Sequence, residues 1–366
     1  MSTGVGLVGA GRVARLHVAA LRELGIPLIG VVSSSPARAA AAARSWEAEG
    51  AFEDLDALVR DPRVDTVHIA TPSALHADQV DRVLRAGKHV VCEKPLSTTA
   101  ARSHELAALA EERGLVGAVA YTYRFHPVVA ALRARVPALG DLRLVRMGYL
   151  QDWLLGADAT EWRLDPTLNG PSRVLADIGS HAIDLIEHVT GDRVSAVSAT
   201  VSSVLRATGG AGADDIAVAS FELAGGAVGS LEVSQVAVGH TNTVRLELSG
   251  VDASAAIDLR DRMHVWHAER EGNGLERVPL PAMHGAPTGT DADYLAAYVA
   301  FILAVRAAVA GVSDGVLPTF ADCHRAHVVR DAVQRAARER AWVDIRASAE
   351  PPPGASTEPD AVTVTL

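Results

Sequence analysis

The chain has 366 residues, of which 49% are hydrophobic and 21% charged, so its length and composition predict roughly two domains with well-buried cores. Its net charge of −10 argues against nucleic acid and anionic membrane as partners, because the sequence has no basic footprint. The two cysteines lack CxxC spacing, no apolar run reaches about 18 residues, and no signal peptide precedes the first strand, so we expect a cytoplasmic protein.

The first 120 residues alternate apolar strands with helices. We expect strands at 5–8, 28–32, 64–70, 88–92 and 116–120, and helices at 14–24, 36–49, 76–86 and 96–113. Because the connections are short, this rhythm predicts a doubly wound parallel sheet with right-handed crossovers, a Rossmann domain at 1–121.

The pattern changes after Tyr121. Strand-like segments are found at 142–150, 194–204, 217–223, 227–236 and 244–248, and helical ones at 178–189, 293–310 and 319–338. They predict a second, α+β domain at 122–346, built on an open, mainly antiparallel sheet, in a chain whose fold class is α/β. The proline-rich stretch at 347–366 is expected to be a disordered tail.

A glycine-rich turn joins the first expected strand to the first helix. It reads Gly9-Ala10-Gly11-Arg12-Val13-Ala14, a GxGxxA pattern. The glycines permit a tight turn and a close approach of a pyrophosphate, which the N–H groups of the helix N-terminus would bind. The strand, the helix and the parallel rhythm around it favour dinucleotide binding over a plain glycine turn.

The end of the second strand is where a dinucleotide site selects its cofactor. NAD sites usually carry an acid there, which binds the ribose hydroxyls. This chain has Val32-Ser33-Ser34-Ser35-Pro36-Ala37-Arg38 instead. Hydroxyls and a guanidinium suit a 2′-phosphate, so we predict NADP(H) over NAD(H), with NAD(H) still possible and a solvated Arg38 as the alternative.

Thr71 and Pro72 end the third long strand, beside the expected path of the cofactor. His76 opens the next helix, and the sequence leaves open whether it contacts the cofactor or only starts the helix.

Val90 and Val91 lead into Glu93-Lys94-Pro95. Proline cannot donate to a sheet ladder, so the strand must end there and hold Lys94 at its carboxyl edge. Ligands of open α/β sheets bind beyond that edge, which makes Lys94 a candidate for a functional group. The alternative is a lysine in an ordinary connection.

A second informative stretch is the expected helix around 178–189. Asp177, His181, Asp184 and His188 are spaced to share one helix face. Neutral His181 can accept a hydroxyl proton, with Asp177 orienting it, and a charged Lys94 nearby would stabilise a developing alkoxide.

Two other interpretations of this helix remain. The Asp and His spacing is also compatible with a metal site, but no further clear ligand is present, so we expect no metal. A surface helix with a polar face is the second alternative.

Taken in order, GxGxxA, Glu93-Lys94-Pro95 and Asp177-x-x-x-His181 resemble the Gfo/Idh/MocA oxidoreductase family. The resemblance covers almost the whole chain and extends to motifs at 123–127, 152–153, 162–165 and 317–320. It implies a Rossmann domain, a C-terminal domain whose open sheet forms a homodimer or homotetramer, and hydride transfer between NAD(P) and a hydroxyl or carbonyl carbon of a sugar, inositol or similar polyol.

Residue by residue, the resemblance implies that Lys94 and His181 are catalytic and that Asp177 supports them and binds substrate. It implies further that Glu93 and Thr71 line the cofactor path, that Arg163 lies near cofactor or substrate, and that Ser33 and Arg38 match NADP-using members. Candidate binders of the substrate ring are Tyr121, Arg124, Asp152, Trp153, Trp162, Arg163, Asp184 and His240, although Trp153 and Trp162 could equally be core residues.

Our first hypothesis is therefore an NAD(P)-dependent dehydrogenase or reductase acting on CH–OH groups of a sugar-like ring. A non-catalytic NADP-binding regulator is the second hypothesis. The third is an enzyme that cleaves glycosides with redox assistance from bound NAD.

Overall fold

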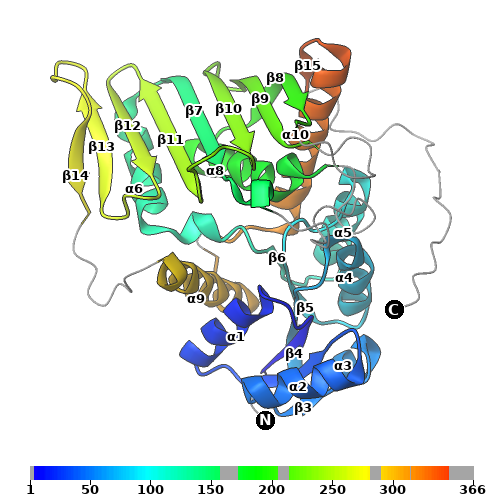
Figure 1. Cartoon of the computed structure of the whole chain (residues 1–366). Helices are drawn as coiled ribbons and strands as arrows, with labels where there is room; N and C mark the ends of the chain where they lie inside the picture. Colours follow the sequence, from blue (N-terminus) through cyan, green and yellow to red (C-terminus); the bar gives the residue numbers. More distant parts are fainter. Residues whose placement is uncertain (1–3, 157–171, 205–213, 281–289, 314, 346–366) are drawn as a thin grey trace.

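The computed structural model describes residues 4–156, 172–204, 214–280, 290–313 and 315–345, whose strands form two sheets (Figure 1). The predicted residues Trp162 and Arg163 and the tail at 347–366 lie outside these ranges, and for residues 290–293 only the backbone is described. No helix in the described part of the chain is both long enough and apolar enough to cross a membrane.

The first sheet has six parallel strands in the order β3-β2-β1-β4-β5-β6. They are β1 (Gly4–Val8), β2 (Leu28–Val32), β3 (Gly50–Ala51), β4 (Val64–Ile69), β5 (His89–Cys92) and β6 (Gly117–Val119). This is the strand order of the dinucleotide-binding Rossmann fold, so the predicted doubly wound sheet is confirmed. The prediction omitted β3 and α3 (Leu55–Arg60), which are too short to show a hydrophobic period.

Helices cover both faces of this sheet. They are α1 (Ala14–Glu23), α2 (Pro36–Trp46), α3, α4 (His76–Arg85), α5 (Ala100–Glu112) and α9 (Thr290–Val309). Successive strand residues point to opposite faces. Val90 therefore belongs to the core under α3, α4 and α5, and Val91 to the core under α1, α2 and α9.

The second sheet has nine strands in the order β14-β13-β12-β11-β7-β10-β9-β8-β15. Neighbours are antiparallel except for β7 and β10, which run parallel, so the mainly antiparallel prediction is confirmed. The strands are β7 (Leu142–Leu150), β8 (Val194–Ser202), β9 (Ile216–Leu223), β10 (Val228–Ser234), β11 (Thr243–Gly250), β12 (Ala253–Asp258), β13 (His264–Glu269), β14 (Glu276–Pro279) and β15 (Val343–Asp344).

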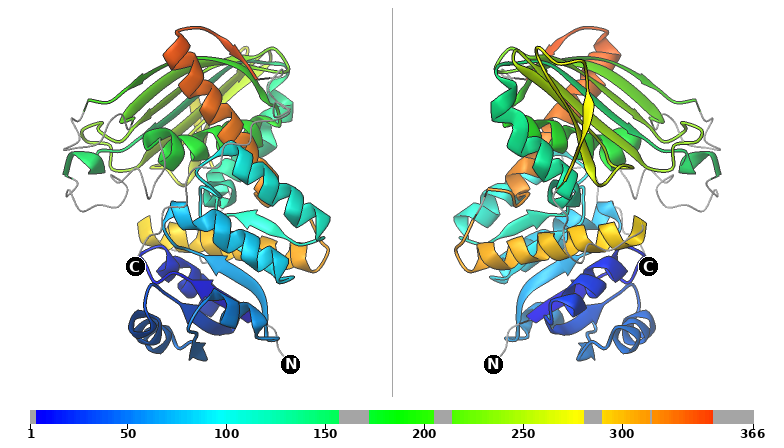
Figure 2. Two further views of the ribbon diagram at one scale, coloured as in Figure 1. Left: turned by 90° about the vertical axis from the view of Figure 1, so that its right-hand side faces the viewer. Right: turned by 90° about the vertical axis from the view of Figure 1, so that its left-hand side faces the viewer.

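One face of the second sheet is covered by helices (Figures 1 and 2). These are α6 (Pro127–Arg135), α8 (Ser180–Thr190) and α10 (Phe320–Glu339). Short turns connect the elements: η1 (Ser73–Leu75), η2 (Thr122–Phe125), η3 (Val136–Leu139), η4 (Trp153–Gly156) and the π-turn η6 (Leu175–Gly179). The inward residues Val145, Met147 and Tyr149 of β7 are buried, whereas Arg146 on the opposite face is exposed.

Helix α9 follows the second sheet in the chain but packs against the first sheet (Figure 2). Its buried residues Tyr298, Phe301 and Ile302 share one apolar cluster with Val18 and Leu21 of α1. The chain therefore crosses between the two sheets again after residue 280. The domain limits at 121/122 and 346/347 stay predictions from the sequence.

The contact between α9 and α1 yields a test of stability. We expect Phe301→Ala to lower the free energy of unfolding by about 3–5 kcal/mol, because the buried ring leaves a cavity. Leu303→Ala on the same helix is the control, since that side chain is 52% exposed and Phe301 is 0% exposed. Chemical denaturation measures both variants, and equal losses would contradict the packing described here.

Candidate active site

The glycine turn accepts no other residue at its first position. Gly9 has φ of 108°, and a Cβ there would lie 2.4 Å from the carbonyl oxygen of Ala70. Helix α1 begins after Val13 with no side-chain cap, whereas Ser35 caps α2 by accepting a hydrogen bond from the N–H of Arg38. The N–H groups of Arg15 and Leu16 donate to the carbonyl oxygens of Arg12 and Val13, whereas those of residues 11–14 make no backbone hydrogen bond in the described part of the chain. The turn thus leaves the N–H groups of residues 11–14 for a ligand, and these groups fit a pyrophosphate.

A main cavity of about 620 Å³ extends from this turn to Lys94 and Asp177. Every described residue that the sequence assigned to the cofactor lines it: Gly9, Gly11, Arg12, Val13, Ser33, Ser34, Arg38, Thr71, Pro72, His76, Glu93 and Lys94. Four strand ends of one parallel sheet supply these residues, which is why segments far apart in sequence meet there.

Lys94 and Asp177 are in direct contact at the far end of the main cavity. The Lys94 ammonium donates to the carbonyl oxygen of Asp177 at 2.9 Å and forms an ion pair with its carboxylate. Gln235, just after β10, donates from Nε2 to the other carboxylate oxygen at 2.7 Å. Gln235 was missed by the sequence analysis because nothing in its local sequence marks it. An ammonium has three N–H donors, so one is left for a ligand oxygen.

Glu93 lies next to Lys94 in a buried hydrogen-bond network. Its Oε1 is 3.0 Å from His17 Nε2 and accepts from the hydroxyl of Tyr298 at 2.7 Å. His17 Nδ1 in turn lies 3.1 Å from His68 Nδ1. Burial acts to raise the pKa of Glu93, but the hydrogen bonds from His17 and Tyr298 and the charge of Lys94 outweigh it and lower that pKa. Glu93 therefore stays a carboxylate beside Lys94.

His76 lines the main cavity but is tied to the backbone. Its Nδ1 lies 2.7 Å from the carbonyl oxygen of Pro95 and its Nε2 lies 2.8 Å from that of Thr71. Burial lowers the pKa of His76, so the ring is neutral and donates to one of the two carbonyls. Of the two roles left open from the sequence, these contacts favour the structural one, because the ring joins the strand ends that flank the cavity.

The four polar residues of the predicted helix face do not share one site. Asp177 lies in η6 and faces Lys94, whereas His181, one turn further on, packs edge-on against the rings of Tyr121 and Tyr123. Burial and then the charge of Lys94 lower the pKa of His181 to about 3. His181 is therefore neutral and close enough to Lys94 for the ammonium charge to act on it, but it is not among the residues that line the main cavity.

Asp184 lies further along α8, where Arg124 donates to both of its carboxylate oxygens at 2.5 to 3.1 Å. Burial raises the pKa of Asp184 to about 6, although the guanidinium opposes the shift. This pair lines a separate cleft of about 190 Å³ together with His188. Asp184 does not reach the main cavity, because each turn of a helix moves the side chain about 5.4 Å along the helix axis, away from Asp177. Arg124, which pairs with Asp184, lies with it outside the main cavity.

Tyr121 is also absent from the lining of the main cavity. It is fully buried, and its hydroxyl lies 3.4 Å from Sγ of Cys323.

A cluster of polar side chains lies beyond His181, and apart from the predicted Trp153 its members were not expected from the sequence. The hydroxyl of Tyr123 lies 2.8 Å from that of Tyr149 and accepts from Nδ2 of Asn242 at 3.0 Å. Asn242 Oδ1 accepts from Gln151 at 2.8 Å, and Gln151 accepts from Nε1 of Trp153 at 2.9 Å. The hydroxyl and amide groups of this polar cluster thus hydrogen-bond to one another at the end of the second sheet.

The remaining predicted ring binders lie at the same end of the sheet. Asp152 accepts from the N–H of Gly239 at 3.1 Å, and His240 Nδ1 lies 3.1 Å from the hydroxyl of Thr243. Both residues therefore hold the loop between β10 and β11. Among the described residues, no group of three or more acids, histidines and cysteines could hold a metal ion.

A Rossmann sheet, an open glycine turn and a lysine at the far end of one cavity define a dinucleotide-dependent oxidoreductase. A family model described as "oxidoreductase family, NAD-binding Rossmann fold" matches residues 3–121, and the GFO/IDH/MocA C-terminal domain matches 130–256. The chain therefore belongs to the GFO/IDH/MocA oxidoreductase family, and the resemblance stated from its motifs is confirmed.

Individual relatives resemble most of the chain. Levoglucosan dehydrogenase of Pseudarthrobacter phenanthrenivorans is 30% identical over 93% of this chain and 97% of its own length. The dTDP-3,4-didehydro-2,6-dideoxy-alpha-D-glucose 3-reductase of Streptomyces violaceoruber is 34% identical over 78% of this chain and 79% of its own. The solved structure of levoglucosan dehydrogenase with NADH and L-sorbose has a TM-score of 0.84 at 29% identity, covering 94% of this chain and 99% of that one.

The buried, neutral His181 gives a pH-dependent prediction. The unfolded chain takes up the imidazole proton near pH 6.5, whereas in the folded chain burial lowers the pKa of His181 to about 3. The stability that His181 contributes is therefore complete above about pH 6.5 and is lost as the pH falls. Acidification from about pH 6.5 to pH 5 should lower the free energy of unfolding of the His181→Asn variant by about 2 kcal/mol less than that of the unmodified protein.

Chemical denaturation at the two pH values measures this difference. His104→Asn is the control, because His104 is exposed on α5. A His181→Asn variant that loses as much stability on acidification as the unmodified protein would contradict the neutral, buried imidazole.

Proposed function

We propose that this oxidoreductase is an NAD(P)-dependent dehydrogenase or reductase that transfers hydride between the nicotinamide and a secondary alcohol or ketone carbon of a sugar, inositol or sugar-like ring. The names of its relatives support a cyclic polyol as substrate, since they include levoglucosan dehydrogenase and, at 26% identity, inositol 2-dehydrogenase of Rhizobium meliloti. The polar cluster of Tyr123, Tyr149, Gln151 and Asn242 supports the same class of ligand.

Bound nicotinamide supplies the hydride acceptor or donor at the reacting carbon. In the proposed mechanism, Lys94 donates a hydrogen bond to the substrate oxygen, and its charge stabilises the alkoxide that develops there. His181, neutral because of burial, accepts the hydroxyl proton in the oxidation and returns it in the reduction. Asp177 positions the ammonium of Lys94 through its carbonyl oxygen and its carboxylate.

The observation that carries this proposal is the pair of Lys94 and Asp177 at the end of the main cavity. The sequence itself adds weight, because Lys88 and Lys94 are the only lysines of the chain, and arginine supplies the other basic residues. Lys88 donates to the carbonyl oxygen of Val64 at 2.7 Å and so has a structural role. A lysine at position 94 supports a site that needs a compact ammonium rather than a planar guanidinium.

For the substrate we keep Asp152, Trp153 and His240 as proposed neighbours and add Gln235 and Asn242. Arg124, Asp184 and Tyr121 are not proposed again, because their contacts occupy them away from the main cavity.

We also propose NADP(H) as the preferred cofactor. No acid follows β2, and no hydrogen bond among the described residues uses the hydroxyls of Ser33 and Ser34, which line the main cavity next to Arg38. The solved relative was obtained with NADH, and the choice in this chain is argued from its own residues.

A homodimer or homotetramer formed through the open face of the second sheet is a further part of the proposal. Exposed valines, Val218 and Val228, lie on that face among the ion pairs Arg146–Glu247 and Arg245–Asp258. A monomeric mass in light scattering at micromolar concentration would contradict it. The cytoplasmic location stays a prediction from the sequence.

The substrate class and the role of Lys94 can be tested together. We expect NADPH-linked absorbance changes with part of a panel of sugars, anhydrosugars and inositols. In Lys94→Ala, kcat should fall by roughly 10²–10⁴, as expected for a positioned acid/base or charge-stabilising group, with cofactor affinity unchanged. Lys88→Ala should keep its activity.

Three outcomes would contradict the proposal. Wild-type turnover in Lys94→Ala would remove the role of the ammonium. Cofactor binding with no turnover on any polyol would favour a non-catalytic regulator. Glycoside cleavage without added nicotinamide would favour a redox-assisted glycosidase.

The cofactor preference is tested by comparing the KM for NADPH with that for NADH in the unmodified enzyme. We expect a lower KM for NADPH, because a guanidinium pairs with the 2′-phosphate and no carboxylate repels it. A clear preference for NADH would refute the assignment.

A further inference from the structure

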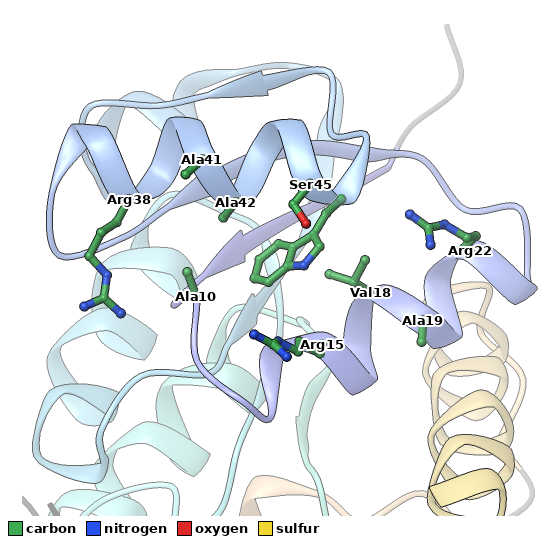
Figure 3. A pocket seen from close by; sticks show the side chains of 10 residues that line it. Ala10, Arg15, Val18, Ala19, Arg22, Arg38, Ala41, Ala42 and Ser45 are labelled. Atoms are coloured by element: carbon green, nitrogen blue, oxygen red, sulfur yellow. The ribbon is translucent and has the colours of Figure 1, made fainter.

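A second cavity of about 600 Å³ lies between α1 and α2, and we refer to it as the α1/α2 groove (Figure 3). Its walls include Arg15 and Arg22 from α1 and Arg38, Ser45 and Trp46 from α2. None of the residues lining it is an acid, so the groove is strongly basic in a chain whose net charge is −10.

The α1/α2 groove meets the main cavity at the glycine turn. Ala10 and Arg38 line both spaces, and Ser33 and Ser34 line the main cavity at the end of β2. Figure 3 shows Arg38 and Arg15 on either side of Ala10, one from each helix. A group attached to a ribose at the end of β2 would therefore reach the place where the two spaces meet, beside Arg38, with Arg15 in the adjoining groove.

The two arginines have no acidic partner in the described part of the chain. Among the described residues, no ion pair or side-chain hydrogen bond involves the guanidinium of Arg15 or Arg38, whereas Arg22 pairs with Glu47 at 3.3 Å. Their charges are thus available to a ligand. Both side chains are exposed, so neither is needed to hold the fold together.

The position of the two arginines on their helices is unfavourable without an anion. Arg15 lies in the first turn of α1 and Arg38 in the first turn of α2, and neither turn contains an acid. The helix dipole disfavours a cation there by about 0.3–1 kcal/mol. Helices α3, α4 and α10 follow the usual rule and carry Asp56, Asp78 and Asp322 in their first turns. A bound anion would reverse the unfavourable interaction at both helix ends.

We propose that Arg15 is a specificity residue for the cofactor, closing a clamp with Arg38 around a phosphomonoester dianion, the ribose 2′-phosphate of NADP(H). This inference rests on the proposed preference for NADP(H) and adds the residue that the end of β2 does not reveal. Arg38 binds the phosphate from the α2 side and Arg15 from the α1 side, with the hydroxyls of Ser33 and Ser34 at the junction of the two cavities. Two guanidinium groups bind a phosphate by charge-assisted hydrogen bonds, the strongest class in water.

The test uses two ligands that differ only in the 2′-phosphate, adenosine 2′,5′-bisphosphate and adenosine 5′-monophosphate, titrated by calorimetry into the full-length protein. The unmodified protein should bind the bisphosphate at least about tenfold more tightly, the factor for one charge-assisted hydrogen bond. Arg15→Gln should lose roughly fivefold to tenfold of affinity for the bisphosphate and none for the monophosphate. Arg22→Gln is the matched control, because it removes the same charge from the same groove at a residue that already has an acidic partner.

The possible outcomes distinguish a failure of the role of Arg15 from a failure of the proposed preference for NADP(H). If the unmodified protein does not discriminate between the ligands, the NADP(H) preference fails and the clamp fails with it. If the unmodified protein discriminates and Arg15→Gln discriminates equally well, only the role of Arg15 is overturned. An equal loss for both ligands in Arg15→Gln, or the same loss in Arg22→Gln, would also overturn it, because neither result depends on the 2′-phosphate at Arg15.

Discussion

The ion pair between Lys94 and Asp177 is the contact on which the rest of the site depends. Lys94 comes from the end of a strand in the first sheet, and Asp177 comes from the π-turn ahead of α8 under the second sheet. An ammonium that is mostly removed from water, as that of Lys94 is, is costly unless an acid and other acceptors surround it. Asp177 supplies both its carboxylate and its carbonyl oxygen, and Gln235 holds the carboxylate in turn. The two sheets are thereby joined at the end of the main cavity, where the proposed mechanism places the substrate oxygen.

The two titratable groups next to this pair, Glu93 and His181, differ in charge. Glu93 stays ionised because His17 and Tyr298 donate to it in the interior of the molecule. His181 stays neutral because it is buried and faces the charge of Lys94. Glu93 and His181 are thus kept in different protonation states by their surroundings, as the proposed proton transfer to His181 requires.

At the opposite end of the main cavity the charged side chains are all positive. Arg12 and Arg38 line it, and Arg15 lies across the adjoining α1/α2 groove. With the uncapped N-terminus of α1, these groups concentrate positive charge where a dinucleotide carries its phosphates. The overall charge of −10 does not reveal this arrangement, because net charge says nothing about where single groups lie.

The sequence by itself determined the parts of the protein that local patterns specify. Apolar strands that alternate with helices specified the Rossmann sheet. The GxGxxA turn and the proline after Lys94 specified the ends of two of its strands, because the conformational limits of glycine and proline act over a few residues.

Only the tertiary structure decided which side chains meet. Helical periodicity indicated the face that Asp177, His181 and Asp184 share, but not how far along the helix the cavity reaches, so Asp184 came to pair with Arg124 instead. Gln235, the return of α9 to the first sheet and the position of Arg15 opposite Arg38 likewise depend on contacts between distant segments, and no local pattern encodes such contacts.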